Sequence, residues 1–521
     1  MLSQFGEFTA SDKLGVRYDV CIAGAGVAGI TLALELAKTG KQVLLLEAGD
    51  IDYSDQSQEV YAGDIVGREY FELDVARLRY LGGTSNHWAG YCRPLDDFDF
   101  EARPELDLTG WPITKSDIAP WFEPAAAILE IDPDYANDVV IDGTDGNLRR
   151  IDVHLSPPVR FGEKYLEALK TSDNIQLVLN ANLVDISVDT ASGVVQSMTI
   201  AGYGEVDQRF DVSADVFVLA LGGIENARAL LNANSQIDAG IGNGRDLVGR
   251  YFMEHVHLDG GFAILNGPLE DHFDGLKSFN RVGEAVNFAI TGDFTRSAQI
   301  LNCEMRLAEI ARGEGKPDQE SWKARIKKML CNSDYVVDIA SYFDEDFKAQ
   351  RCMLAHEHAN ALAGDYDGII RLSAEQEPNP NSRVLLSNER DKFGLRRTAL
   401  DWQLTELDKK TIKESVLELG KHFANEDIGR LKVPDWMLDD GPGIAGMAEG
   451  ERGADFHHLG TTRMAASASE GVVDSNCKIF GSSNFYVTGS SVFASGGHVP
   501  PTLSIVQLTL RLADHLNQRI G

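Results

Sequence analysis

Three glycines near the start of the chain have the spacing of a phosphate-binding turn. The apolar run 18–23 leads into Gly24, Gly26 and Gly29, which form the pattern G-x-G-x-x-G. The first glycine permits a tight bend, the second lets the backbone approach a pyrophosphate, and the third lets helix and strand pack closely. Ala25 lies inside the same turn, and backbone N–H groups at the helix start bind phosphate oxygens. The turn therefore predicts a nucleotide site.

An acidic residue follows at the distance that a dinucleotide site requires. A second apolar run covers 42–46 and ends in Glu47, about 20 residues beyond the glycines. The carboxylate can accept hydrogen bonds from the hydroxyls of an adenosine ribose. Glycines alone would also fit an ordinary turn, but strand, turn, helix, strand and acid together predict dinucleotide binding. The pattern leaves open whether the dinucleotide is NAD or FAD.

Histidines gather near the other end of the chain. The segment 457–464 reads His-His-Leu-Gly-Thr-Thr-Arg-Met, and His498 precedes a pair of prolines. Imidazole has a pKa of about 6.5, so it can exchange a proton near neutral pH. In an extended segment neighbouring side chains point to opposite faces, so His457 and His458 would not both face the same site. Without further context, a buried core histidine is the alternative for each.

Composition limits the class of protein. The chain has 521 residues, a formal charge of −32, 43% hydrophobic residues and 25% charged residues. This length predicts two domains, and the negative charge argues against nucleic-acid partners. An anionic cofactor must then be bound by backbone N–H groups and helix dipoles rather than by a basic field.

Cysteine usage and hydropathy bear on location. The six cysteines lack C-x-x-C spacing, which argues against a metal site and against a disulfide framework. Cys21 falls inside the first predicted strand, where we expect a small buried residue. No run of about 18 apolar residues occurs, and 1–16 lacks the features of a secretory signal. We expect a reducing, cytoplasmic setting without a transmembrane segment.

The elements that must position these residues form an α/β pattern that leaves the nucleotide-binding domain and returns to it. Strand-like runs at 175–179 and 216–221 extend the first unit. Alternating stretches at 285–291 and 382–387, with a helix at 409–423, indicate an antiparallel sheet with helices. A final strand at 484–487 precedes a helix that begins at Pro501. We predict three parts: nucleotide-binding 1–256 with excursions, substrate-binding 257–445, and a return at 446–521.

Five ordered motifs resemble the glucose–methanol–choline (GMC) family of flavin oxidoreductases along nearly the whole chain. They are the N-terminal fingerprint, the loop 82–85, the turn at 222–223, the His-x-x-Gly-Thr motif at His457, and the closing 489–491 with its Pro-Thr helix. The resemblance implies a Rossmann-like FAD-binding domain and a substrate domain, an architecture shared with p-hydroxybenzoate hydroxylase. It also implies oxidation of a CH–OH group by hydride transfer to flavin N5, with His457 accepting the hydroxyl proton. His458 then points the other way if the segment is extended, and we expect it to be structural.

The resemblance also implies which residues contact FAD. The helix opening at Pro501 and Thr502 directs its partial positive charge at the flavin pyrimidine ring. The other residues that the resemblance places against FAD lie in the glycine turns, beside the ribose and adenine, and in the loop 82–88. They are Gly24, Ala25, Gly26, Gly29, Glu47, Gly83, Thr84, Ser85, His87, Leu183, Gly222, Gly489 and Ser490.

The chain departs from the family at Pro500. Relatives place Asn or His there, to bond the substrate oxygen beside the catalytic histidine, whereas proline has neither a side-chain donor nor an N–H. In one interpretation His498 supplies the missing imidazole. In the other His457 works alone, and His498 only contacts the flavin or packs.

His87 raises the question of a covalent bond. The loop 82–88 resembles that of pyranose 2-oxidases and choline oxidases, in which a histidine at this offset is bonded to the flavin 8α-methyl group. Many relatives bind FAD reversibly, so a noncovalent contact is the alternative.

Three functions therefore compete. The first is an FAD-dependent oxidase or dehydrogenase acting on a sugar, polyol or other alcohol, with O₂, a quinone or a redox protein as electron acceptor. The second is lyase- or decarboxylase-type chemistry on the same fold, and the third is a non-catalytic flavoprotein.

The segment 322–330, with four basic residues, is either a lid or docking helix or a solvated helix packed on the core.

Overall fold

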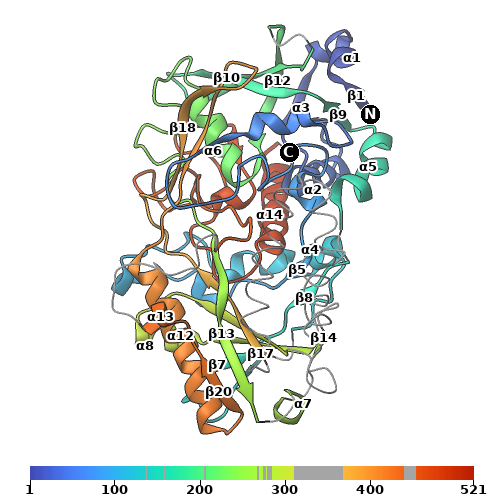
Figure 1. The fold of residues 1–521 in the computed structure, drawn as a ribbon. Helices are drawn as coiled ribbons and strands as arrows, with labels where there is room; N and C mark the ends of the chain where they lie inside the picture. Colours follow the sequence, from blue (N-terminus) through green and yellow to red (C-terminus); the bar gives the residue numbers. More distant parts are fainter. Residues whose placement is uncertain are drawn as a thin grey trace.

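Two large β-sheets organise the chain. The structure, a computed structural model, describes residues 1–135, 138–157, 159–204, 207–266, 269–273, 277–278, 284–309, 368–438 and 453–520. Within these ranges each large sheet has eight strands. The first sheet and its helices occupy the upper half of Figure 1, and the second sheet lies below them.

The first sheet is built around parallel, buried strands. At its centre β2 (Arg17–Ala23) pairs in parallel with β3 (Val43–Leu46) on one side and with β12 (Arg209–Leu219) on the other. Every residue of β3 is buried, as expected of a parallel strand covered on both faces. The remaining strands are β1 (Leu2–Gln4), β9 (Ile175–Leu179), β10 (Asn182–Asp189), β11 (Val194–Ala201) and β21 (Phe485–Val487).

The C-terminal part of the chain returns to this sheet. Strand β21 pairs in parallel with β12 on the edge that β2 leaves free. The last helix, α14 (Thr502–Ile520), packs against α2 (Val27–Lys38), the helix that follows the first glycine turn. Its buried face includes Leu508, Leu512 and Leu516, at the spacing that the sequence predicts. The C-terminal segment therefore packs with the first sheet and with the helix that follows the first glycine turn.

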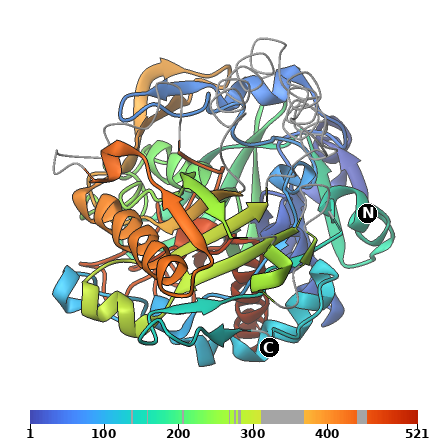
Figure 2. The same cartoon turned by 60° about the horizontal axis from the view of Figure 1, so that its bottom comes forward.

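The second sheet is antiparallel. Its order is β20-β13-β17-β16-β15-β7-β6, with β14 paired to β15. The helix α12 (Glu406–Asn425) lies across this sheet (Figure 2) and begins at Thr405, whose side chain caps it. The strands are β6 (Val139–Val140), β7 (Leu148–Arg150), β13 (His255–Leu265), β14 (Lys277–Ser278), β15 (Glu284–Ile290), β16 (Cys303–Glu309), β17 (Gly368–Glu375) and β20 (Gly429–Lys432).

Shorter elements complete the described part. A three-stranded sheet joins β4 (Gly63–Ile65), β18 (Arg383–Arg390) and β19 (Arg396–Asp401), and a ribbon joins β5 (Tyr91–Cys92) to β8 (His154–Leu155). The other α-helices are α1 (Phe5–Thr9), α3 (Asp55–Gln58), α4 (Phe122–Leu129), α5 (Phe161–Thr171), α6 (Gly222–Asn232), α7 (Leu269–His272), α8 (Gly292–Ala298) and α13 (Asp435–Leu438).

The structure refines the predicted division of the chain. Strands β6 and β7 come from the first predicted part but pair into the second sheet, and the boundary at 256–257 falls inside β13.

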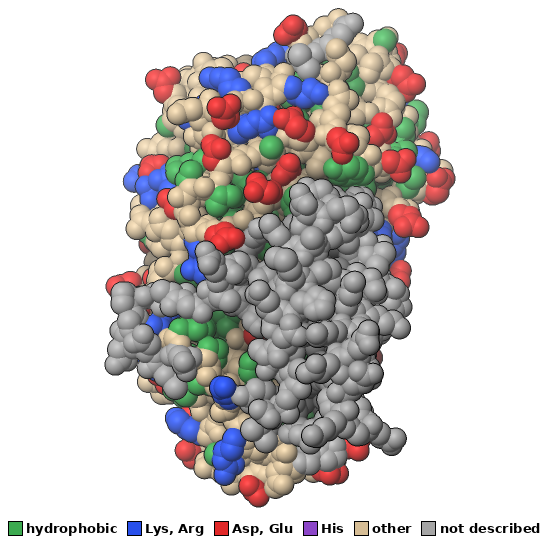
Figure 3. Space-filling view, in the orientation of Figure 1, with side chains coloured by type: hydrophobic (Ala, Val, Ile, Leu, Met, Phe, Trp, Pro, Cys, Tyr) green, Lys and Arg blue, Asp and Glu red, His purple; other side chains and the backbone are tan. Residues whose placement is uncertain are grey.

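The hypothesis of a lid at 322–330 concerns residues outside the described ranges. No described helix is both long and apolar enough to cross a membrane. On the face shown in Figure 3, acidic and basic side chains are interspersed rather than gathered by sign.

Candidate active site

The first glycine turn has the geometry that a bound pyrophosphate needs. Gly24 has φ +103°, and a Cβ there would lie 2.5 Å from the Ala220 carbonyl oxygen. At Gly29 a Cβ would lie 1.8 Å from the oxygen of Gly24, so helix and strand can pack only without a side chain. At Gly26, by contrast, the nearest protein atom would be 3.9 Å away. Gly26 lines a pocket, so the space above it is available to a ligand.

A single cavity joins the two ends of the chain. It has a volume of about 300 Å³ and runs from the first glycine turn to the start of α14. Of the residues predicted to contact cofactor or substrate, all but Gly29 and His498 lie in its wall: Gly24, Ala25, Gly26, Glu47, Gly83, Thr84, Ser85, His87, Leu183, Gly222, His457, Gly489, Ser490, Pro501 and Thr502. Gly29 instead makes the helix–strand contact described above.

Glu47 is held at the end of β3 by backbone donors. Its Oε2 accepts a hydrogen bond from the Ala25 N–H at 2.9 Å, and its Oε1 accepts one from the Gly49 N–H at 2.9 Å. Burial raises the pKa of Glu47, and these N–H groups oppose that shift. Carboxylate oxygens accept more than one hydrogen bond, so acceptor capacity remains for ribose hydroxyls.

Three arginines in the cavity wall were not anticipated. Arg77 and Arg228 both bind Glu225, at 3.2 and 2.7 Å, and Arg79 donates to the Asn182 side chain at 2.9 Å. The sequence argument from net charge expected backbone groups and helix dipoles instead of basic side chains. A chain-wide charge does not reveal where individual arginines are buried beside carboxylates. Their distribution along the sequence offers no motif that would have found them.

The ring of His457 is mostly buried, and part of its side chain is exposed. Its backbone N–H donates to Glu254 Oε2 at 2.8 Å, and its Nδ1 lies 2.8 Å from Nδ1 of His255. The side chain is 19% exposed, and Nε2 lies 3.9 Å from an oxygen of Asp455. Burial lowers the pKa of His457, while Asp455 acts in the opposite direction. The ring is therefore neutral near pH 7 and borders the cavity.

Glu254 anchors the backbone of the histidine segment. It is fully buried, accepts a hydrogen bond from the Tyr70 hydroxyl, and has its pKa raised to about 8 by burial. His458 also lines the cavity, and its Nε2 lies 2.9 Å from the Tyr70 oxygen. The sequence expectation that His458 is structural is consistent with this bond, although the ring does not turn away from the cavity. Glu254 and His255 directly precede the predicted second part, where no motif marks them.

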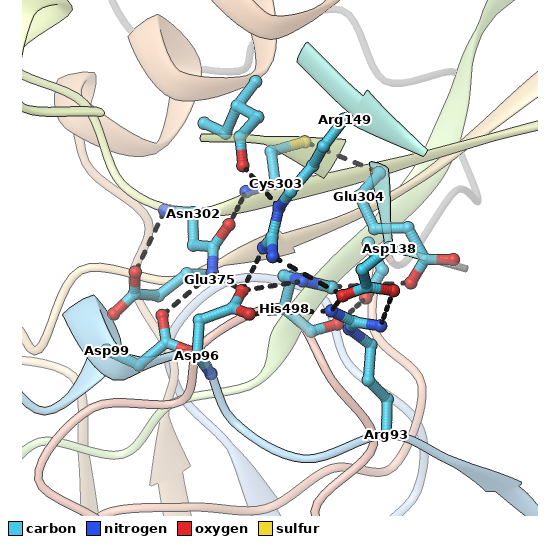
Figure 4. Close-up of polar contacts among 12 residues, drawn as sticks. Arg93, Asp96, Asp99, Asp138, Arg149, Asn302, Cys303, Glu304, Glu375 and His498 are labelled. Atoms are coloured by element: carbon cyan, nitrogen blue, oxygen red, sulfur yellow. Dashed lines mark hydrogen bonds and ion pairs between the residues drawn. The ribbon is translucent and has the colours of Figure 1, made fainter. Parts of the chain in front are cut away.

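His498 lies outside the cavity wall, in a buried polar cluster. Its Nε2 is 3.5 Å from Asp96 and its Nδ1 is 3.5 Å from Glu304 (Figure 4). Burial alone would lower its pKa, but the two carboxylates raise the pKa of His498 to about 9. The structure thus does not bring His498 to the position left by Pro500, which itself lines the cavity. This placement favours the interpretation in which His498 packs and His457 works alone.

The cluster around His498 joins the segment 93–103 to the second sheet. Arg149 on β7 binds Asp96, and Asn302, next to β16, donates to Asp99 at 2.9 Å (Figure 4). Arg103 makes two hydrogen bonds to Glu375 on β17, at 2.9 and 2.6 Å. Both groups of that pair are nearly inaccessible to solvent. These contacts are structural, because they link the segment 93–103 to the second sheet away from the cavity.

His87 lines the cavity, and both of its ring nitrogens are buried and, among the described residues, unpaired. Neither ring nitrogen has a hydrogen-bond partner in the described part of the chain, and the ring stacks on Phe456 with centroids 6.0 Å apart. Burial, assisted by Arg160, lowers the pKa of His87 to about 3. A neutral imidazole with a free lone pair is the form that a covalent bond to a flavin methyl group would use. A noncovalent contact is equally compatible with this geometry.

Metal and sulfur chemistry have no visible centre in the described ranges. No group of three or more His, Cys, Asp or Glu there could hold a metal ion. The four described cysteines, Cys21, Cys92, Cys303 and Cys477, are buried and unpaired.

Two family models match the chain. One described as FAD dependent oxidoreductase matches residues 19–236, and one described as GMC oxidoreductase matches residues 378–509. The first range contains the glycine turn and Glu47, and the second contains His457 and the start of α14.

Characterised relatives align over almost the whole chain. A 2-methyl-1,2-propanediol dehydrogenase of Mycolicibacterium austroafricanum is 22% identical, with 96% of each chain covered. The large subunit of a fructose dehydrogenase of Gluconobacter japonicus is also 22% identical, covering 95% of this chain and 97% of that one.

Solved structures show the same fold. Pyridoxine 4-oxidase from Mesorbium loti aligns with a TM-score of 0.56 at 15% identity, covering 96% of this chain and 99% of that one. A fungal aryl-alcohol oxidase aligns with a TM-score of 0.55 at 15% identity, with the same coverage.

Proposed function

Because this chain belongs to the GMC family of FAD-dependent oxidoreductases, we propose that it oxidises the CH–OH group of an alcohol or a sugar with His457 as general base. One observation carries the proposal: a neutral imidazole lies in the wall of the same cavity as the dinucleotide-binding turn and the start of α14. The named relatives act on a diol and a sugar, which supports this substrate class.

The chain's own residues account for the binding of FAD. The first glycine turn and the start of α2 would hold the pyrophosphate, and Glu47 the ribose. The start of α14 lies in the cavity wall, where a helix N-terminus carries about half a positive charge. This charge stabilises negative charge that develops beside it during the reaction. Bound FAD supplies the two-electron acceptor for the carbinol hydride.

His457 supplies the proton chemistry. Its Nε2 accepts the proton of the substrate hydroxyl, which gives the oxygen alkoxide character and makes the carbinol C–H a better hydride donor. The substrate leaves as a carbonyl compound, having lost one proton to His457 and one hydride. A positioned general base contributes about 100- to 10,000-fold to such a step.

An anaerobic substrate screen tests the proposal. We expect the absorbance of the oxidised flavin to bleach when an alcohol or sugar is added, and to return with O₂, a quinone or a redox protein. Failure of a broad panel to bleach the flavin would instead support the lyase- or decarboxylase-type alternative. Full biological activity of His457→Ala would support the third hypothesis, a non-catalytic flavoprotein.

The mode of FAD attachment has its own test. A bond from His87 to the flavin keeps the yellow colour in acid-precipitated protein, and His87→Ala releases it. Colour that passes entirely into the acid supernatant of the wild-type protein establishes the noncovalent alternative. Either result is compatible with the unpaired nitrogens of His87.

A further inference from the structure

His255 lies behind the proposed base, at the first position of β13. The side chain is fully buried, and its two ring nitrogens have different partners. Nε2 lies 3.2 Å from the carbonyl oxygen of Gly496, and Nδ1 lies 2.8 Å from Nδ1 of His457. His255 and His457 are 202 residues apart in the chain, so only the folded structure brings the rings together.

The Gly496 carbonyl determines where the proton of His255 resides. A carbonyl oxygen only accepts hydrogen bonds, so Nε2 of His255 must carry a hydrogen. Burial opposes a charge on this ring, and the pKa of His255 lies well below its usual value, chiefly through desolvation and then through His457. The neutral ring carries one N–H hydrogen, and the Gly496 carbonyl places it on Nε2. Its Nδ1 is therefore an acceptor, and Nδ1–H of His457 is the donor.

This chain of contacts determines which nitrogen of His457 can act as a base. With hydrogen on Nδ1, the neutral ring of His457 has its basic lone pair on Nε2. That atom has no hydrogen-bond partner among the described residues. We propose that His255 is a positioning residue, which fixes the Nδ1–H tautomer of His457 and so makes Nε2 the base. The inference rests on the proposed role of His457 in alcohol oxidation.

The same contact supports the protonated base. When Nε2 of His457 accepts the substrate proton, its Nδ1–H becomes the donor of a charge-assisted hydrogen bond to His255, which strengthens the contact. Among the charged groups, Asp455 favours the protonated ring, whereas His257 on β13 disfavours it. His498 and His257 further disfavour a charge on His255, so the proton stays on His457.

Local backbone geometry keeps the Gly496 carbonyl in place. A Cβ at Gly496 would lie 3.3 Å from Nε2 of His255 and 3.0 Å from Leu459, so a side chain would crowd the ring. Gly497 has φ +57°, and a Cβ there would lie 2.6 Å from Asp99. Gly496 therefore lets the chain pass directly beside the buried imidazole, and Gly497 lets it pass beside Asp99.

Three variants separate positioning from general packing. His255→Ala removes the acceptor, His255→Asn restores an oxygen at the place of Nδ1, and His257→Ala changes a nearby exposed histidine on the same strand. In anaerobic stopped-flow reduction we expect His255→Ala to lose at least about tenfold in limiting rate with substrate affinity little changed. His255→Asn should recover most of that loss, and His257→Ala should stay within about threefold of wild type.

A spectroscopic measurement tests the tautomer without turnover. In ¹⁵N-histidine-labelled holoenzyme, long-range ¹H–¹⁵N correlations distinguish the Nδ1–H from the Nε2–H form. The His457 signals are identified by their loss in His457→Ala. We expect Nδ1–H for His457 in wild type and in His255→Asn, and an increased Nε2–H population in His255→Ala.

The outcomes distinguish this inference from the proposed function. An Nε2–H tautomer in wild type, or an unchanged tautomer and rate in folded, flavin-loaded His255→Ala, would overturn the role of His255 while leaving His457 as base. Full activity in His457→Ala would overturn the proposed function itself. If His255→Ala does not fold, His255→Asn and the wild-type tautomer still decide the question.

Discussion

Two histidines from the C-terminal part of the chain show how neighbours decide the chemistry of one side chain. His457 lies beside a neutral histidine and borders the cavity, and its pKa is lowered. His498 lies between Asp96 and Glu304 in the cluster of Figure 4, and its pKa is raised to about 9. The first ring is free to accept a proton near pH 7, whereas the second already holds one. Burial lowers the pKa of both rings, but His498 has two carboxylates at 3.5 Å whereas His457 has one at 3.9 Å, and that makes the difference.

The largest expected effect in this comparison is on turnover. His457→Ala should lower the rate of flavin reduction by about 100- to 10,000-fold, because a positioned base is lost. The FAD content should remain near that of wild type, since the residues expected to bind the phosphates and ribose are untouched. Stopped-flow reduction and the ratio of flavin to protein absorbance provide the two measurements. A loss below tenfold would mean that another group accepts the proton.

The matched change at His498 should act on stability instead. His498→Gln leaves Asp96 and Glu304 without their shared cation, and breaking a buried ion pair costs about 3–5 kcal/mol. We expect a drop of this order in the free energy of unfolding in urea, with a reduction rate within about tenfold of wild type. A loss of 100-fold or more with stability intact would return His498 to the role that Pro500 leaves vacant.

The stability difference should depend on pH in one direction. The pKa of His498 rises from 6.5 to about 9 on folding, so its contribution is complete below pH 6.5 and is lost as the pH rises through about 9. The gap in unfolding free energy between wild type and His498→Gln should therefore shrink between pH 6.5 and pH 9. Urea titrations across this range measure it, and a gap that widens with pH would contradict the ion-pair assignment.

The smallest expected effect is on the acid side of the activity profile. Because burial lowers the pKa of His457, kcat/KM should fall only below pH 6.5 and be level just above it. Asp455, His255 and His257 surround this ring, so Asp455→Asn should move the acid limb to still lower pH by removing a nearby negative charge. An acid limb centred above pH 6.5 in wild type would show that a different group controls the rate.

The residues proposed to bind the cofactor are local features of the sequence. The G-x-G-x-x-G turn, Glu47 and the start of the last helix all lie in the cavity wall, apart from Gly29. Each is a local feature: a glycine needed by the backbone, or a residue at a fixed offset from a strand. The role of Gly29 in packing also follows from its spacing alone.

The proton-transfer half of the site does not follow in the same way. The motif at His457 predicts the proposed base, but no recognisable pattern marks its partners Glu254, directly before β13, and His255, the first residue of β13. His498 shares the sequence features of a candidate catalytic residue, yet the structure places it between Asp96 and Glu304, two carboxylates from two other segments. The arginines of the cavity wall were likewise hidden within an acidic composition.

The sequence by itself determined the elements and the cofactor turn, because strand and helix periodicity and the conformational freedom of glycine act over short stretches of chain. The tertiary structure alone decided which imidazole meets the cavity and which meets an acid. A pKa depends on burial and on charges within a few ångströms, and those neighbours are brought together only when both sheets assemble. The contact between His255 and His457, across 202 residues, is the clearest case.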